Sequence, residues 1–281
     1  MKVEEVKRRL AELGAQPKRS LGQNFLLNEA VIDKILTATL AFRPQRLIEV
    51  GPGLGALTQG LRQSQIPLTL IELDRRFADY WRGEGVQVVE GDALKWNWQS
   101  LEVERNIVVV SNLPYQIAAS LVLELSCGPQ AVDGMVLMFQ KEVAERITAA
   151  ARTADYGLLT VIAQTFWEIE KLTDAGPRDF YPAPKVISRV LKFARRPPPV
   201  VGRAFLKFVK VAFQQRRKLL ARNLQTLSHE LDFSWWQQKL RELGLSDTAR
   251  AEELNPKQFV ELYRIYEATR DQAAEGASHG H

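Results

Sequence analysis

The sequence of 281 residues has little cysteine, little histidine and no long apolar run. Cys127 is its one cysteine, so an intrachain disulfide is excluded and we expect a reducing, cytoplasmic compartment. The histidines are His229, His279 and His281, and this placement argues against Ser-His-Asp or Cys-His catalysis and against a metal site. No apolar run approaches about 18 residues, so we expect no membrane-spanning helix. The charged start of the chain lacks the apolar core of a secretory signal, so we expect none.

Positive charge is concentrated near the end of the chain. The whole sequence has 38 Lys and Arg against 33 Asp and Glu, a net charge of +5. Residues 1–194 hold 23 side chains of each sign, residues 195–270 hold 15 basic and 8 acidic ones, and residues 271–281 hold 2 acidic ones. The excess over 195–270 is compatible with a nucleic acid or an anionic membrane surface, and alone it does not distinguish them.

In the first part of the chain, short apolar stretches alternate with segments whose apolar residues recur at helical spacing. We predict strands at 46–50, 67–72, 86–90, 106–111, 132–139, 166–175 and 185–194. Helical patterns between the first five indicate a parallel sheet covered on both faces. The last two stretches follow each other across a proline-rich loop, so they predict an antiparallel pair at the sheet edge. The fold class is therefore α/β, with a seven-stranded, mostly parallel sheet.

Three consecutive prolines at 197–199 mark the clearest domain boundary, because such a run forms a stiff extended spacer. We expect a first domain over residues 1–196, which includes a helical and basic extension at 1–27. A small all-α domain should follow over 197–270, and the small-residue end, 271–281, should be disordered. The helices expected in the second domain lie at about 203–227, 234–243 and 256–269.

A glycine-rich turn follows the first predicted strand. Gly51 and Gly53 let a ligand approach the backbone, and the helix that follows offers free N–H groups. Glu72 ends the second strand, 21 residues after Gly51, where a carboxylate can bind ribose hydroxyls. Gly51, Gly53 and Ala56 also satisfy a dinucleotide-binding pattern, so the turn alone leaves an NAD oxidoreductase open.

Two further carboxylates favour a different cofactor. Glu49 lies just before the glycines, where it suits a ligand with a cationic amino acid part. Asp92 ends the third strand and is placed to bind an adenine amino group, although it is also a plausible helix N-cap. With Glu72, these residues suit S-adenosylmethionine. A hydride-transfer base and a substrate domain, which an NAD oxidoreductase needs, have no signal in the sequence.

The fourth strand ends in Asn112-Leu113-Pro114-Tyr115, which is either a simple Asn-Pro turn or a site for an exocyclic amine. The Asn112 side-chain carbonyl and the next backbone carbonyl can both accept hydrogen bonds from such an amine, and Pro114 has no N–H to compete. Tyr115 offers a ring for base stacking, which contributes about 1–3 kcal/mol. This pattern suits methylation of an adenine N6, with catalysis by positioning and electrostatics and without a histidine base.

These motifs closely resemble the KsgA family of ribosomal RNA adenine N6,N6-dimethyltransferases, and the resemblance covers about residues 17–262. The matching segments, in order, are Lys18–Leu26, Glu49–Thr58, Ile71–Asp74, Gly91–Ala93, Asn112–Tyr115, Gln140–Arg146, Tyr156–Gly157, Phe180–Val186 and Ala212–Lys218. The resemblance implies a Rossmann-like, S-adenosylmethionine-dependent methyltransferase fold with a small all-α C-terminal domain. Gln116, Ser120 and Arg222 depart from the family's usual residues.

The resemblance also implies roles for individual residues. The S-adenosylmethionine site would be built from Asn24, Leu26, Gly51, Gly53, Glu72, Asp92 and Asn112. Asn112 and Leu113 would hold the adenine amine, and Tyr115 and Phe180 would stack the flipped base. The implied substrate is a pair of adjacent adenines in a 3′-terminal hairpin loop of small-subunit (16S) rRNA, each dimethylated during ribosome biogenesis. Unpaired loop bases suit this reaction because they are readily splayed into a pocket.

Basic residues supply candidate RNA contacts, and a solvated helix face is the alternative for them. The candidates are Lys18, Arg19, Arg216, Arg217, Lys218 and Arg222. We therefore predict a monomeric enzyme that acts on small-subunit rRNA within a pre-30S particle. A large-subunit rRNA adenine methyltransferase of the macrolide-resistance type remains an alternative, as does an assembly factor that does not depend on catalysis.

Overall fold

The computed structural model describes residues 2–18, 21–101, 105–197, 201–228 and 230–278. The chain forms two compact units. The first contains residues 1–145 and 167–195, and the second contains residues 146–166 and 196–281. The expected boundary near 196 is therefore adjacent to the observed one, but 146–166 belongs with the C-terminal residues instead of with the sheet. The sequence places this segment between two strands, which is why its membership is missed.

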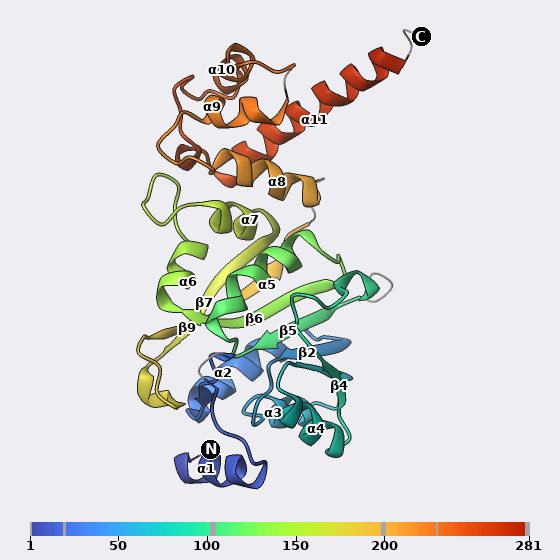
Figure 1. The fold of residues 1–281 in the computed structure, drawn as a ribbon, viewed down its shortest axis with the longest axis vertical. Coiled ribbons are helices and arrows are strands. Elements are labelled where there is room, and N and C mark those ends of the chain that lie inside the picture. The colour runs from blue at the N-terminus through green and yellow to red at the C-terminus, as the bar shows by residue number, and fades with distance from the viewer. Residues whose placement is uncertain (1, 19–20, 102–104, 198–200, 229, 279–281) are drawn as a thin grey trace. The chain divides into compact units, whose positions relative to one another are not determined.

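The first unit is built on a seven-stranded sheet with the order β4-β3-β2-β5-β6-β9-β7 in the described part of the chain (Figure 1). Strand β9 runs antiparallel to both of its neighbours, β6 and β7, the other described pairs of this sheet are parallel, and β7 forms one edge. The predicted antiparallel pair is thus confirmed. The strand bounds are β2 Arg46–Val50, β3 Leu68–Glu72, β4 Gln87–Glu90, β5 Ile107–Ser111, β6 Val132–Gln140, β7 Trp167–Ala175 and β9 Ser188–Arg195.

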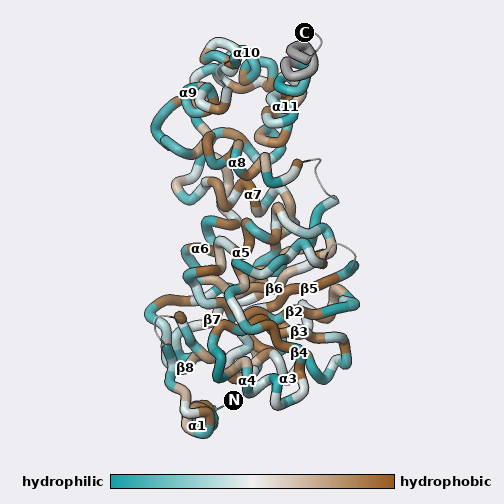
Figure 2. Tube along the Cα trace, turned by 45° about the vertical axis from the view of Figure 1, so that its right-hand side comes forward, coloured by the Kyte–Doolittle hydropathy of each residue, from teal (hydrophilic) through white to brown (hydrophobic). Residues whose placement is uncertain are grey.

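Apolar β-branched residues explain the position of the central strands. β5, with the sequence IVVVS, is buried along its whole length, as expected for a strand covered on both faces. The hydropathy colouring shows these strands as the apolar interior of the unit (Figure 2). Helix α2 packs against β6 and β7, α5 against β6, and α4 against β3 and β4. The helix bounds here are α1 Val3–Glu12, α2 Glu29–Leu40, α3 Thr58–Gln63, α4 Arg75–Gly83 and α5 Tyr115–Cys127, and α6, Lys141–Ile147, begins in this unit and has its last two residues in the second.

A short second sheet joins the N-terminal segment to the loop before β9. Strand β1, Phe25–Leu26, pairs antiparallel with β8, Phe180–Tyr181. Leu26 and Phe180 are register partners, and both side chains belong to the core cluster that also contains Val31 and Ile32 of α2. The pairing brings two segments that lie far apart in the sequence to the same side of the unit.

The second unit is helical, and aromatic side chains form its core. Phe208 packs against Tyr263 and Tyr266, with ring centroids 5.3 and 5.8 Å apart, and against Trp236 at 6.1 Å. Burial of such rings dominates the energetics of small cores. Tyr156, before α7, is tied into this unit because its hydroxyl donates to the Leu254 carbonyl at 2.7 Å. The helix bounds are α7 Leu158–Phe166, α8 Arg203–Ala212, α9 Leu220–Leu224, α10 Phe233–Glu242 and α11 Pro256–Ser278.

Two helix predictions differ from the structure. A continuous helix over 203–227 is expected, but α8 ends at Ala212 and α9 begins at Leu220. The buried Asn223 side chain stabilises the break, because its Nδ2 donates to the carbonyls of Ala212 at 2.7 Å and Gln215 at 3.2 Å. Helix α11 continues to Ser278, so residues 271–278 have a helical backbone where disorder is expected, and residues 279–281 lie outside the described residues.

The described ranges lack two further kinds of feature. None of the helices there is both long enough and apolar enough to cross a membrane. The same residues contain no group of three or more His, Cys, Asp or Glu side chains that could hold a metal ion.

Candidate cofactor and target-base site

The largest set of predicted site residues meets in one pocket of the first unit. The strand order reverses between β2 and β5, and ligands of open α/β sheets bind at the carboxyl ends of the strands beside such a point. The pocket lies at these ends. It is lined by the predicted residues Asn24, Leu26, Gly51, Gly53, Glu72, Asp92, Asn112 and Pro114, together with Glu49, Gln23, Phe25, Leu73 and Gln116.

The glycine turn after β2 is held in place by a tryptophan of α4. Gly53 and Gly55 have φ values of +51° and +85°, a region that side chains with a Cβ rarely adopt. The Trp81 Nε1 donates to the Gly53 carbonyl at 2.9 Å, and a Cβ on Gly55 would overlap the Trp81 ring. The turn therefore needs glycine for two reasons, backbone conformation and the close approach of the indole.

Glu72 at the end of β3 anchors the same turn from the other side. Its Oε2 accepts from the Gly53 N–H at 3.2 Å and its Oε1 accepts from the Asp74 N–H at 2.8 Å. Burial raises the pKa of this carboxyl above its ordinary value, and the backbone N–H donors oppose that effect. Backbone contacts thus hold the carboxylate in place where Glu72 lines the pocket.

Glu49 is the most deeply buried carboxyl of the pocket, with 2% of the residue exposed. The Thr58 hydroxyl, at the start of α3, donates to its Oε2 at 2.7 Å. Burial raises the pKa of Glu49 to about 8, with nearby Glu72 adding to the shift and Thr58 opposing it. A neutral carboxyl in this position becomes a strong partner for a cationic group that enters the pocket, because the cation favours the ionised form.

Asp92 follows β4 and precedes a turn instead of the helix that an N-cap would need, so its role toward an adenine amino group stays a prediction. Its Oδ1 accepts from the Leu94 N–H at 2.9 Å, which caps the turn locally, while the residue also lines the pocket. Three carboxyl groups, Glu49, Glu72 and Asp92, therefore stand at successive strand ends around a glycine turn. This donor set fits an adenosine that carries a cationic amino acid moiety, as in S-adenosylmethionine.

The amide of Asn112 has a defined orientation. Its Nδ2 donates to the Asn24 backbone carbonyl at 3.0 Å, which directs the Oδ1 away from that carbonyl and leaves it as a hydrogen-bond acceptor at the pocket. The preceding Ser111 donates its hydroxyl proton to the Val50 carbonyl, so the end of β5 is tied to the end of β2. Asn112 is thus held at a defined place beside the glycine turn.

The other members of the predicted target site lie around the pocket but do not line it. Leu113 is buried, with its side chain in the core. Tyr115 is half-buried, and its hydroxyl forms a hydrogen bond of 2.7 Å with the hydroxyl of Ser188 at the start of β9. Phe180 is 4% exposed and belongs to the core cluster that contains Leu26, so stacking of a base on its ring stays a prediction.

The candidate RNA contacts have different environments. Lys18 in the first unit pairs with the buried Asp74 at 2.7 Å, and Arg19 lies outside the described residues. In the second unit, the exposed Arg216 pairs with Glu252 at 3.0 Å. The Arg222 guanidinium lies 4.0 Å from the centroid of the Phe233 ring. Lys18, Arg216 and Arg222 therefore each contact a residue of their own unit.

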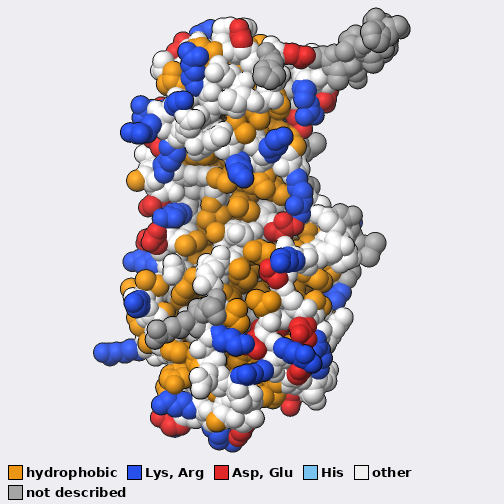
Figure 3. Space-filling model, in the orientation of Figure 1, with side chains coloured by type: hydrophobic (Ala, Val, Ile, Leu, Met, Phe, Trp, Pro, Cys, Tyr) orange, Lys and Arg blue, Asp and Glu red, His pale blue; other side chains and the backbone are white. Residues whose placement is uncertain are grey.

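Arg217 and Lys218 are exposed in the turn between α8 and α9. Lys and Arg side chains are spread over the visible face that the helices of this unit present (Figure 3). Basic charge is therefore accessible on the second unit, although it does not form one compact cluster in the view.

Several residues of the site are missed by the sequence patterns. Thr58 and Trp81 support Glu49 and Gly53, and each comes from a helix where the sequence predicts only packing. Ser188 contacts Tyr115 across 73 positions of sequence, and such a contact has no local signal. Gln116 stands out in the sequence only as a departure from the family pattern, yet it lines the pocket.

Known proteins resemble this chain over most of its length. The family model described as "Ribosomal RNA adenine dimethylase" matches residues 14–268. A ribosomal RNA small subunit methyltransferase A of Bdellovibrio bacteriovorus is 52% identical, over 94% of this chain and 97% of the relative. The protein with the same name from Natranaerobius thermophilus is 34% identical, over 93% of this chain and 95% of the relative.

Solved structures show the same fold. A dimethyladenosine transferase from Plasmodium falciparum matches with a TM-score of 0.70 at 22% identity, covering 87% of this chain and 98% of the other. The 23S rRNA methyltransferase ErmE matches with a TM-score of 0.63 at 25% identity, covering 86% and 98%. The predicted fold class and the predicted family are confirmed: the chain belongs to the ribosomal RNA adenine dimethylase family.

Proposed function

We propose that this protein transfers methyl groups from S-adenosylmethionine to N6 of two adjacent adenines in a 3′-terminal hairpin loop of small-subunit rRNA. The observation that carries the proposal is the oriented amide of Asn112, whose Oδ1 is an acceptor at a pocket that also holds Glu49, Glu72 and Asp92. The two curated relatives named above are small-subunit methyltransferases, which supports the choice of ribosomal subunit.

The pocket residues divide the binding of the cofactor among them. In this proposal, Glu72 would accept hydrogen bonds from ribose hydroxyls, and Asp92 from the adenine amino group. Glu49 would pair with the amino acid ammonium group, while Gly51 and Gly53, which also line the pocket, would let the ligand approach the backbone. Asn24 and Leu26 close the side formed by the N-terminal segment. When bound, S-adenosylmethionine supplies a methyl group on a cationic sulfur, which is electrophilic.

The Asn112–Tyr115 turn orients the nucleophile. The lone pair of an adenine N6 is delocalised into the ring, so the amine is a weak nucleophile. The Asn112 Oδ1 and the Leu113 carbonyl accept hydrogen bonds from its two N–H groups, and Pro114 contributes no competing N–H. These two acceptors favour a tetrahedral nitrogen with its lone pair directed at the methyl group. Tyr115, and by the family resemblance Phe180, would stack the flipped base.

The second unit is proposed to dock the RNA. Residues 195–270 carry the positive excess of the sequence, and Arg217 and Lys218 are exposed within it. Contacts to phosphate position a protein on RNA without reading bases, so they complement the base-specific site in the first unit. We propose that the protein acts in the cytoplasm as a monomer, on rRNA within a pre-30S particle.

The likeness to a 23S rRNA methyltransferase keeps large-subunit RNA as a second candidate substrate. The experiment offers labelled S-adenosylmethionine with undermethylated small subunits, with large subunits and with naked rRNA, and then maps the modified base. We expect label on adjacent adenines of small-subunit rRNA, as dimethyladenosine. Label on large-subunit RNA alone would overturn the substrate, and no transfer to any RNA would favour an assembly factor that works without catalysis.

A further inference from the structure

The start of strand β9 contacts the aromatic ring of the target-base turn. Ser188 is the first residue of β9 and is fully buried, and its Oγ lies 2.7 Å from the Tyr115 Oη. Tyr115 is the first residue of α5 and is half-buried, so part of its side chain remains accessible. The hydroxyl contact therefore fixes the far end of a ring whose near end is fixed by the backbone.

Ser188 is held by the sheet on both sides. Its register partners are Gln140 at the end of β6 and Ala175 at the end of β7. A strand with hydrogen-bonded neighbours on both sides has little freedom to move, in contrast to an edge strand or a loop. The Ser188 hydroxyl is thus presented to Tyr115 from a strand that has a paired neighbour on each side.

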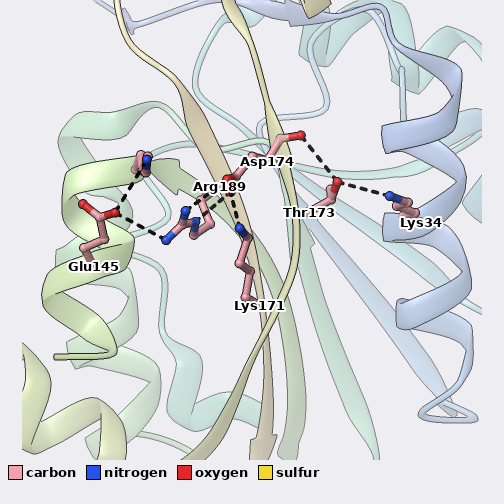
Figure 4. A network of polar contacts seen from close by, with 7 residues as sticks. Lys34, Glu145, Lys171, Thr173, Asp174 and Arg189 are labelled. Carbon is pink, nitrogen blue, oxygen red and sulfur yellow. Dashed lines mark hydrogen bonds and ion pairs between the residues drawn. The ribbon is translucent and has the colours of Figure 1, made fainter. Parts of the chain in front are cut away.

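The next residue, Arg189, secures the same end of β9 through a polar network (Figure 4). Its Nε and Nη2 donate to the two carboxylate oxygens of Asp174 on β7 at 2.7 and 3.0 Å, and its Nη1 lies 3.5 Å from the Glu145 carboxylate of α6. The bidentate geometry is the stronger form of such a pair. The Arg189 guanidinium beside it holds the pKa of Asp174 at about 2, so this contact persists across the neutral range.

The network extends from β7 to a helix on the opposite side of it. Lys34 of α2 donates to the Thr173 hydroxyl at 3.3 Å, next to Asp174. The end of the β7–β9 pair is consequently linked to α2 and to α6. These contacts tie the end of the pair that contains the buried Ser188 to two helices.

We infer that Ser188 is a positioning residue for the target base: its hydroxyl fixes the tilt of the Tyr115 ring on which the adenine stacks. The inference rests on the proposed function, because it assumes that Tyr115 is the stacking platform. A stacked base follows the tilt of its platform, and the amine must stay aligned with the methyl group. Small misplacements of this kind reduce rates strongly.

The position of Ser188 predicts which step it affects. Ser188 and Tyr115 are absent from the residues that line the cofactor pocket. A change at Ser188 should therefore slow methyl transfer without changing the affinity for S-adenosylmethionine. A serine that only stabilises the fold would instead leave the transfer rate of the folded enzyme unchanged.

Ser126 provides a matched control in the same unit. It is also fully buried and also bonds to an aromatic side chain, because its Oγ accepts from the Trp167 Nε1 at 2.8 Å. It lies near the C-terminal end of α5, and Tyr115 begins the same helix. The Ser126→Ala substitution thus removes a comparable hydrogen bond without touching the target turn.

The test measures single-turnover methyl transfer to undermethylated small ribosomal subunits, and the dissociation constant for S-adenosylmethionine. Ser188→Ala and Tyr115→Phe should each slow transfer roughly tenfold, the effect of losing one buried hydrogen bond. The double variant should be no slower than either single variant, because both remove the same contact. Ser188→Thr, which keeps the hydroxyl, should recover most of the rate, and Ser126→Ala should transfer at the wild-type rate.

Each outcome has a defined meaning. Wild-type transfer by folded Ser188→Ala, or additive effects in the double variant, would overturn the inference. If Ser188→Ala does not fold, wild-type transfer by Tyr115→Phe overturns it instead. Tyr115→Ala distinguishes the inference about Ser188 from the proposed role of Tyr115. If Tyr115→Ala is inactive while Tyr115→Phe transfers at the wild-type rate, only the inference about Ser188 fails. If Tyr115→Ala transfers normally, the proposed role of Tyr115 fails as well.

Discussion

Glu49 should make the stability of the cofactor-free protein depend on pH. The unfolded chain loses the Glu49 proton near the ordinary pKa of 4.5, whereas the buried native carboxyl keeps it until the pH reaches its raised pKa of about 8. Between these values the unfolded state is ionised and the native state is neutral, so stability falls as the pH rises. The slope from this one group approaches about 1.4 kcal/mol per pH unit between roughly pH 5 and 7.5.

The Glu49→Gln variant isolates this contribution, because glutamine keeps the shape of the side chain and cannot ionise. Urea unfolding of the wild type and the variant at pH 6 and pH 8 gives two differences in unfolding free energy. From pH 6 to pH 8, the unfolding free energy of the variant should increase by about 2 kcal/mol relative to that of the wild type. Thr58→Val is the companion variant: losing the hydroxyl that lowers the Glu49 pKa should extend the pH-dependent loss to higher pH.

The same group should link cofactor binding to pH. An ammonium group beside Glu49 favours its ionised form, so wild-type affinity for S-adenosylmethionine should rise between pH 6.5 and 8.5, and Glu49→Gln should lose that rise. Equal pH dependence of unfolding in the wild type and Glu49→Gln would show that the native carboxyl is already ionised. That result would refute the reasoning that burial keeps Glu49 neutral until a cation enters the pocket.

Three further substitutions test other parts of the site. Asn112→Ala should reduce methyl transfer at least about a hundredfold while RNA binding, measured by filter retention, stays near wild type; equal activity would remove Asn112 from the mechanism. Gly55→Ala should abolish measurable S-adenosylmethionine binding in calorimetry because its Cβ would overlap an indole ring, whereas Gly85→Ala, with a similar φ of +76° in open space, should only destabilise the protein by about 1 kcal/mol. Replacing Arg217 and Lys218 with Gln should lower the slope of log affinity for rRNA against log salt by about 2, and an unchanged slope would exclude them as phosphate contacts.

The sheet and the pocket follow closely from the sequence. The predicted strands at 46–50 and 106–111 agree with β2 and β5 to within a residue, because buried parallel strands require unbroken apolar runs. The carboxyl ends of such strands meet at one edge, so the sequence alone is enough to bring Gly51, Glu72 and Asp92 together. Local patterns and a simple topological rule suffice for this part of the site.

The remaining features depend on contacts between distant residues. The break between α8 and α9 is stabilised by the side chain of Asn223, which donates to the Ala212 carbonyl. The helical periodicity of the sequence does not predict this break. The contact between Ser188 and Tyr115 arises only when β9 enters the sheet beside β6. The family resemblance predicts that Phe180 stacks the base. Its burial depends on the pairing of β1 with β8, and strands of two residues are too short to be predicted from a sequence pattern.

The central claim is that the turn at 112–115 presents a small-subunit rRNA adenine to S-adenosylmethionine. Its most direct test is to map the methyl groups that the wild-type protein adds to undermethylated small ribosomal subunits, with Asn112→Ala in parallel. The account predicts N6,N6-dimethyladenosine at two adjacent positions of the 3′-terminal hairpin loop with the wild type, and none with the variant. Methyl groups on another base, or equal labelling by both proteins, would contradict it.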